Sequence, residues 1–138
     1  QVAAVADLDG DSRSDLVWRN AASGELYGWL MDGSSATASA SLGNPGTAWS
    51  VAAAADLTGD GRADLLFRNG ATGQIYGWVT GTSGLAVASQ GHIGFDGNGW
   101  ALARVADYSG DDKADLLFTY AGQGFAWMWQ MDGLTIAT

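Results

Sequence analysis

Internal repetition is the feature that most constrains this chain. Three similar segments, ADLDGDSRSDLVWRN, ADLTGDGRADLLFRN and ADYSGDDKADLLFTY, begin at positions 6, 55 and 106, at intervals of 49 and 51 residues. A fixed period of this length is typical of repeat proteins in which each unit is one supersecondary element. Large side chains further along each unit keep the same register: Trp29, Trp78 and Trp129.

Each unit is predicted to contain four short β-strands. An apolar segment such as VAAVADL leads into an acidic loop, and a strand rich in β-branched and aromatic residues, such as DLVWRN, follows at once. A glycine-containing turn, a third strand such as ELYGWLM and a weaker fourth strand such as ATASASL complete the unit. Four strands in about 50 residues is the size of one propeller blade. We therefore predict an all-β fold of three four-stranded antiparallel β-propeller blades.

The predicted domain organisation is a single repeat domain over residues 1–138, with units 1–49, 50–100 and 101–138. The third unit is about a dozen residues shorter than the others and is expected to be incomplete. Three blades are fewer than the four to eight that usually close a ring. Two explanations stay open: the chain is part of a longer repeat protein, or a homodimer completes a ring.

The charge distribution indicates a bound cation. The net charge is −9, and eleven of the fifteen acidic residues lie in the three loops, unlike the diffuse acidity of a solubilising surface. The five arginines and one lysine form no basic stripe, so no nucleic-acid partner is expected. There is no cysteine for a disulfide framework. No apolar run approaches the ~18 residues of a membrane helix, so no membrane insertion is expected.

The first acidic loop has the spacing of a calcium site. Counted from its first aspartate, Asp7, Asp9, Asp11 and Asp15 occupy positions one, three, five and nine, and Arg13 occupies position seven. Calcium takes six to eight oxygen ligands at about 2.4 Å in a flexible shell. We expect positions one, three and five to converge, position seven to offer its backbone carbonyl with its charge directed outward, and position nine to close the shell.

The other two loops repeat this spacing with fewer charges. A hydroxyl replaces the carboxylate at position three, so on charge count the first loop should bind calcium most tightly, given equal geometry. Position six is expected to need a positive φ. The candidate ligands of the second and third loops are Asp56, Thr58, Asp60, Arg62 and Asp64, and then Asp107, Ser109, Asp111, Lys113 and Asp115.

An alternative without metal stays open, because aspartates in turns often only accept hydrogen bonds from backbone amides. Several carboxylates in one loop, however, repel one another unless a cation or an arginine neutralises them. Magnesium demands stricter octahedral geometry, and no histidine or cysteine cluster indicates zinc. We predict up to three Ca²⁺ ions, one in each loop.

The loop pattern D-x-[DNST]-G-D-x-x-x-D-L, followed by an apolar strand, resembles the FG-GAP repeat of integrin α-subunit propellers. It is similar also to bacterial and fungal VCBS-type repeats, in which W-R-N and Y-G-W-x-M-D-G-like strands are common. The resemblance covers essentially the whole chain and implies propeller blades with calcium between the first two strands of each blade. It further implies adhesion, sugar binding, or service as a non-catalytic tail of a secreted hydrolase. The departures from the family are the uncharged Thr58 and Ser109 at position three, Ser12 and Asp112 at position six, and too few blades to close a ring.

The aromatic residues are predicted to have two roles. The large residues that recur on the second and third strands are expected to pack between units, and Tyr27, Tyr76 and Trp127 are expected on the opposite face of the third strand. Trp49 and Trp100 follow glycine-rich loops and are the candidate ligand-binding platforms.

Catalysis finds no support in the sequence. His92 is the only histidine, and neither a nucleophile elbow nor a phosphate-binding loop is present. We expect a secreted, extracellular, non-catalytic calcium-binding module that binds a carbohydrate or a protein surface. The alternative is a calcium-stabilised accessory domain of a larger secreted hydrolase.

Overall fold

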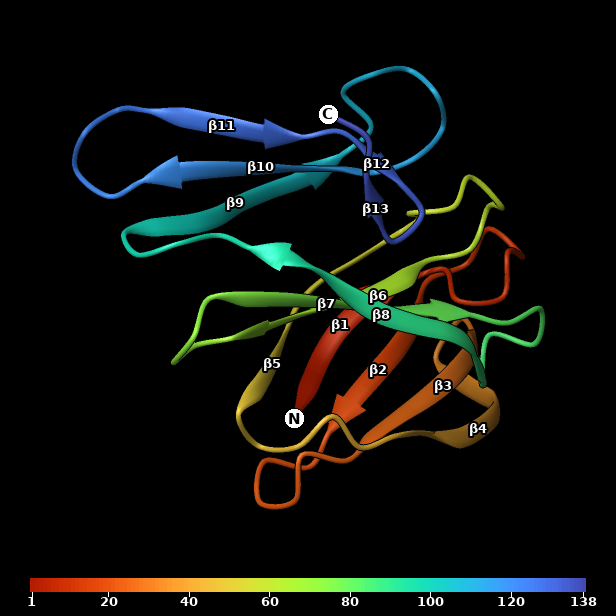
Figure 1. The fold of residues 1–138 in the computed structure, drawn as a ribbon. Coiled ribbons are helices and arrows are strands. Elements are labelled where there is room, and N and C mark those ends of the chain that lie inside the picture. The colour runs from red at the N-terminus through yellow and green to blue at the C-terminus, as the bar shows by residue number, and fades with distance from the viewer.

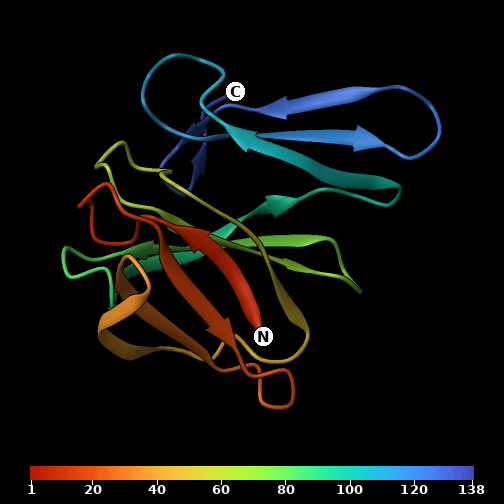
Figure 2. The ribbon, with the colours of Figure 1, turned by 180° about the vertical axis from the view of Figure 1, so that it is seen from behind.

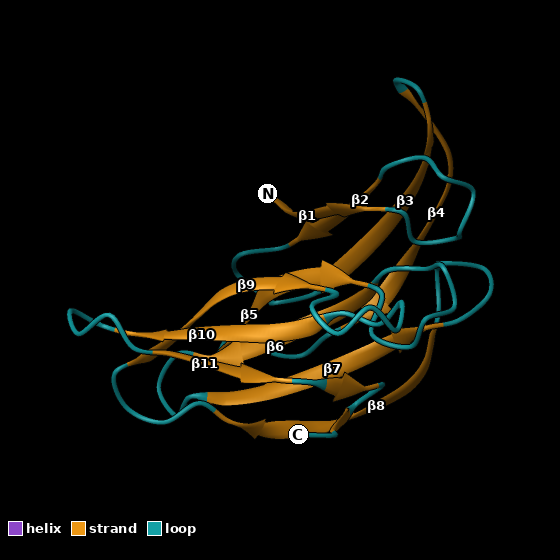
Figure 3. Ribbon diagram, turned by 90° about the horizontal axis from the view of Figure 1, so that it is seen from above, coloured by secondary structure: helices purple, strands orange, loops and turns teal.

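The computed structural model describes all 138 residues and contains β-strands, turns and loops but no helix (Figure 3). The strands form antiparallel sheets of four, four, three and two strands. The prediction of an all-β fold is confirmed. The structure has no helix of the length and apolarity that crossing a membrane requires.

The first two units are four-stranded meanders in which each strand pairs with the next along the chain. The first unit consists of β1 (Val2–Ala6), β2 (Asp15–Arg19), β3 (Leu26–Asp32) and β4 (Ser35–Gly43). The second unit consists of β5 (Trp49–Ala55), β6 (Asp64–Asn69), β7 (Gln74–Thr80) and β8 (Val87–Phe95).

The third unit differs from the predicted four-stranded blade. Its strands are β9 (Trp100–Ala106), β10 (Asp115–Tyr120), β11 (Ala126–Trp129), β12 (Met131–Asp132) and β13 (Thr135–Ile136). β9 to β11 form a three-stranded sheet, and β12 and β13 form a separate pair. The prediction was wrong here because Gln130 interrupts the third strand, and only two residues of the fourth strand pair with the short segment that follows Gln130. β11 is therefore an edge strand, and its Trp127 is 63% exposed.

The three units stack in chain order, with the second between the first and the third (Figures 1 and 2). Their first strands lie beside one another, β1 next to β5 and β5 next to β9, as the innermost strands of propeller blades do. One hydrophobic cluster fills each junction. The first contains Leu8, Val17, Leu26, Leu42, Ala63, Leu65, Phe67 and Trp78. The second contains Leu57, Leu66, Ile75, Ile93, Ala114, Leu116, Phe118 and Met131.

The second unit contributes to both clusters because successive side chains of a strand point to opposite faces. Leu65 and Phe67 pack against the first unit, whereas Leu66 packs against the third. The expectation that Tyr76 lies on the face opposite Trp78 was wrong. Both residues belong to the first junction, since two positions along a strand return to the same face.

The predicted packing role of the recurrent aromatic residues is confirmed at both junctions. The Phe67 and Trp78 ring centroids are 4.8 Å apart, and those of Phe118 and Trp129 are 4.6 Å apart. The stack is propeller-like, but the chain by itself closes no ring, because the first and third units lie on opposite sides of the second (Figure 1).

Candidate metal centre and aromatic pockets

Each acidic loop connects the first strand of a unit to the second, and the three loops lie on the same side of the stack, at the right in Figure 1. Position two is a fully buried leucine in the first two loops, Leu8 and Leu57, and an exposed tyrosine, Tyr108, in the third. Position nine is a buried aspartate that begins the next strand in every loop. Both ends of the first two loops are therefore held by the packed core, and the residues at positions three to seven of all three loops are exposed or half-buried.

The aspartate at position one folds each loop by accepting backbone hydrogen bonds. The amides of Gly10 and Ser12 each lie 2.7 Å from a carboxylate oxygen of Asp7, and the Asp11 amide lies 3.2 Å away. Asp56 and Asp107 accept the corresponding bonds in their own loops. This is the Asx-turn arrangement that the sequence left open, a motif that does not itself require a metal.

The backbone conformation at position six is as predicted. Ser12 has a φ of 70° and Asp112 a φ of 65°, and these are the only residues other than glycine with positive φ. Gly61, at the same position of the second loop, has a φ of 82°. Serine and aspartate adopt this region less readily than glycine, and the bonds from their amides to Asp7 and Asp107 hold them there.

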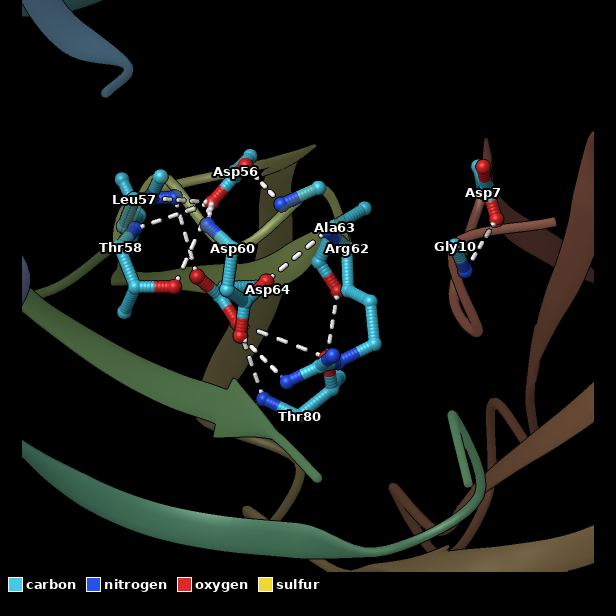
Figure 4. A network of polar contacts seen from close by, with 12 residues as sticks. Asp7, Gly10, Asp56, Leu57, Thr58, Asp60, Arg62, Ala63, Asp64 and Thr80 are labelled. Atoms are coloured by element: carbon cyan, nitrogen blue, oxygen red, sulfur yellow. Dashed lines mark hydrogen bonds and ion pairs between the residues drawn. The ribbon is translucent and has the colours of Figure 1, made fainter. Parts of the chain in front are cut away.

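The aspartate at position nine has a second role that the sequence did not reveal. Asp15 is buried and accepts hydrogen bonds from the amides of Leu8 and Met31, both at 2.8 Å. It thereby ties the loop to the third strand of the unit. Figure 4 shows the same arrangement in the second loop, where Asp64 lies between Leu57 and Thr80. The equivalent in the third loop is Asp115.

Three carboxylates converge in the first loop. Asp7, Asp9 and Asp15 each place one oxygen within 4.8 Å of the other two. Oxygens bound to one calcium ion at 2.3–2.6 Å are at most about 5 Å apart, so these three residues fit one side of a calcium shell. Partial burial raises the pKa of Asp9, and the charges of Asp11, Asp15 and Asp7 raise it further. A cation would relieve this crowding.

Burial also acts on the second loop. It raises the pKa of Asp64 to about 6, and the charges of Asp60 and Asp56 add to the shift, although the amides of Thr80 and Leu57 oppose it. A carboxylate that is fully buried and still charged at neutral pH is stabilised by a neighbouring cation.

The aspartate at position five was expected to converge with those at positions one and three, but its carboxylate lies apart from them. Asp11 turns to Arg13, whose Nη1 lies 2.9 Å from its carboxylate. Asp60 pairs with Arg62 in the same way (Figure 4). Arg13 and Arg62 thus each neutralise a carboxylate of their own loop. In the third loop, Lys113 instead lies 2.6 Å from Asp132.

Position three does not add a carboxylate to the second and third loops. The hydroxyls of Thr58 and Ser109 lie 3.4 and 3.5 Å from Asp56 and Asp107, where they remain available as neutral oxygen ligands. Of the three loops, only the first brings three carboxylates together.

Comparison with known protein families identifies the repeat. The family model described as the FG-GAP-like repeat matches residues 7–67 and 56–118, which together span most of the chain. The chain belongs to the FG-GAP-like repeat family. Neither curated proteins nor solved structures gave a match. In this FG-GAP-like repeat protein, each matched segment runs from one acidic loop to the second strand of the next unit.

The two candidate ligand-binding tryptophans of the FG-GAP-like units each line an aromatic pocket at a junction. Trp49 lines a pocket of about 200 Å³ between the first and second units, with Phe67, Tyr76, Trp78, Asn44, Pro45 and Gln90. Trp100 lines a pocket of about 290 Å³ between the second and third units, with Phe95, Asp96, Phe118, Trp127 and Trp129. Both tryptophans are half-buried, so part of each ring faces solvent.

Arginines of the W-R-N and F-R-N segments position the connections that carry these tryptophans. Arg19 Nη2 donates to the Trp49 carbonyl at 2.9 Å. Arg68 Nε lies 2.6 Å from the buried carboxylate of Asp96, just before Trp100 in the chain. Sequence reasoning missed this pair, although the recurrence of arginine at one register position was a signal for it.

Proposed function

We propose that this FG-GAP-like repeat chain is a secreted, non-catalytic module that is stabilised by calcium and binds carbohydrate in its junction pockets. The observation that carries the metal assignment is the convergence of Asp7, Asp9 and Asp15. Their carboxylates would supply three oxygens of the shell, and the carbonyl of Arg13 and water would supply others. Calcium would add positive charge where the carboxylates crowd one another, and would brace a chain that has no disulfide.

The second and third loops would bind calcium more weakly. Each offers three carboxylates, at positions one, five and nine, and one hydroxyl, against four carboxylates in the first loop, and Asp60 would first have to leave Arg62. Affinity in such loops follows the number of charged ligands and the rigidity of the site. Up to three ions would bind, the first loop filling at the lowest calcium concentration.

Thermal unfolding tests the metal assignment. Unfolding is recorded in EDTA, in millimolar calcium and in millimolar magnesium, and direct calorimetric titration counts the sites. Calcium should raise the melting temperature more than magnesium does. Glu25→Gln, which removes one negative charge outside the loops, is the matched control and should keep the calcium response. An unchanged melting temperature in calcium would contradict the assignment and leave the aspartates as turn formers.

The junction pockets are proposed to bind sugar rings. Each combines aromatic faces with a few polar groups, the usual composition of a small-molecule site. Asn44 and Gln90 in the first pocket are placed to exchange hydrogen bonds with hydroxyls, whereas the carboxylate of Asp96 in the second pocket is buried and already paired with Arg68. Two similar pockets in one chain would give multivalent binding.

A glycan array followed by tryptophan fluorescence titration tests this assignment. Trp49→Ala and Trp100→Ala should each weaken binding of an array hit, and the double variant should abolish it. Phe125→Ala is the control, because this exposed aromatic residue lines neither pocket. A silent array with an intact, calcium-stabilised fold would instead favour a protein ligand or the accessory-domain role in a larger secreted hydrolase.

The absence of catalysis is also a proposal. His92 is exposed on β8 and lines neither pocket. Hydrolysis of glycosides or esters by the purified chain, lost in His92→Ala, would contradict it.

A further inference from the structure

The two junctions within the chain are built in the same way. We call the face of a unit that packs on the following unit its receiving face, and the face that packs on the preceding unit its inserting face. The amide of Ala63 donates to the Asp7 carbonyl, and the amide of Ala114 to the Asp56 carbonyl, each at 2.7 Å. Every junction therefore pairs the receiving face of one unit with the inserting face of the next.

A leucine of the inserting face sits over a glycine of the receiving face at both junctions. A Cβ atom on Gly28 would lie 2.9 Å from Leu85 Cδ2, and a Cβ atom on Gly77 would collide with Leu134 Cδ2. A side chain at either strand position would therefore have to displace the leucine that covers it.

One inserting face and one receiving face stay uncovered. On the inserting face of the first unit, Trp29 is 38% exposed, whereas its equivalent Trp78 in the first junction is 6% exposed. On the receiving face of the third unit, Tyr108 is 45% exposed, whereas its equivalents Leu8 and Leu57 are fully buried. The uncovered faces are thus opposite halves of the kind of interface that the chain forms twice internally.

The residues that replace glycine and leucine on these two faces are complementary in size. Met128 occupies the position of Gly28 and Gly77, and it is 37% exposed. Ser34 occupies the position of Leu134, since each follows a glycine of positive φ in the turn after a Met-Asp pair. At the internal junctions the small residue is on the receiving face and the large residue is on the inserting face; on the two uncovered faces this arrangement is reversed.

This exchange decides which occupant the third unit accepts. A following unit of the internal kind would bring a leucine against the Met128 side chain, which stands where the internal junctions leave the space of a glycine. The first unit of a second copy brings Ser34, which leaves room for the methionine side chain.

We propose that the receiving face of the third unit binds the inserting face of the first unit of a second copy, with Met128 packed over Ser34 of that copy. The same contact formed twice about a two-fold axis joins the two copies into a ring of six units, within the range of known propellers. The contact continues the internal junctions, although β13 ends at Ile136 and makes its outer part shorter. This inference does not depend on calcium or on carbohydrate binding.

Sedimentation velocity over a range of concentrations tests the proposal. The chain should have twice its 14.2 kDa mass. Ser34→Leu should raise the dissociation constant at least about tenfold, because the overpacked contact occurs twice in each ring. Met128→Gly should also weaken the dimer by leaving a cavity, and the double variant Ser34→Leu/Met128→Gly should restore it by recreating the internal pair. Ala71→Leu, at an exposed turn of the second unit, should change nothing.

Disulfide trapping gives an independent readout, since the chain has no cysteine of its own. Oxidation of an equimolar mixture of Ser34→Cys and Met128→Cys variants should yield a covalent heterodimer, and Ser34→Cys alone should not cross-link. A monomer at 100-micromolar concentrations, a particle larger than two chains, or a dimer that neither forms this disulfide nor responds to Ser34→Leu would each overturn the proposal.

Discussion

Substitutions of two aspartates of the first loop should differ strongly in their effect on stability without calcium, and the contrast separates a metal ligand from a structural hydrogen-bond acceptor. Asp9 accepts one hydrogen bond, from the Asp11 amide at 3.2 Å, and lies among other carboxylates. Asp15 is buried and accepts two, from the amides of Leu8 and Met31. The perturbations are Asp9→Ala and Asp15→Ala, each studied in EDTA and in calcium.

The expected magnitudes follow from these contacts. In EDTA, Asp9→Ala should change the free energy of unfolding by no more than about 1 kcal/mol, the net worth of one ordinary hydrogen bond. Asp15→Ala leaves two amides without an acceptor, at about 1–3 kcal/mol each, so it should destabilise by about 2–6 kcal/mol. Calcium at a hundredfold excess over its Kd adds about 2.7 kcal/mol per site. Both variants should lose the share of that gain that belongs to the first loop.

The assay is urea unfolding followed by tryptophan fluorescence, with the chain at one fixed concentration so that any self-association contributes equally. Glu25→Gln serves again as the charge control. If Asp9→Ala kept the full calcium gain, Asp9 would not be a ligand and the convergence of carboxylates would have been misread. If Asp15→Ala were as stable as the wild type in EDTA, the assigned tie between the loop and β3 would be wrong.

Three further predictions concern other parts of the fold. Burial raises the pKa of Asp64 to about 6 in the folded state, so its charge destabilises the fold above pH 6, and this destabilisation disappears as the pH falls towards 4. In EDTA, the free energy of unfolding of the wild type should therefore rise by up to about 3 kcal/mol relative to that of Asp64→Asn between pH 7 and pH 4. An equal pH dependence of the two proteins would refute this. Gly77→Ala should lower stability by about 1–3 kcal/mol through overpacking against Leu134, and Leu134→Ala in the same chain should recover part of the loss in a denaturation cycle; purely additive effects would show that the two residues do not touch. Arg68→Ala leaves the buried Asp96 unpaired, so it should cost about 3–5 kcal/mol in urea unfolding, and Arg68→Ala/Asp96→Ala should be less destabilised than the single variant.

The strands of the first two units could be predicted from the sequence because the patterns that specify them lie within a single repeat. The alternation that buries Leu65 and Phe67 on one face and Leu66 on the other is local, and so is the need for positive φ at Ser12 and Asp112. The third unit was mispredicted where the sequence carries no local signal. Nothing in GFAWMWQMDG marks Gln130 as the point where the third strand is interrupted.

Side-chain contacts between different strands and loops could not be predicted from the sequence either. The pairing of Arg68 with Asp96 joins residues 28 positions apart, and only the fold brings them together. The turning of Asp11 to Arg13 is local, but it depends on the competition between a basic neighbour and a shared cation. The spacing in the sequence predicts that the Asp11 carboxylate lies near both Arg13 and the expected cation site, but it does not predict which of the two the carboxylate contacts.

The distribution of aspartate among the loop positions follows from these separate roles. Positions one, five and nine hold aspartate in all three loops, and in every loop these residues accept the backbone bonds that fold the loop and tie it to the third strand. Position three has few such bonds, and it is aspartate only in the first loop. The fold of the loop therefore uses three carboxylates, whereas the fourth, at position three of the first loop, adds charge that the fold alone does not need. That surplus charge is what a cation would use, so the first loop is where calcium binding and turn formation can be distinguished.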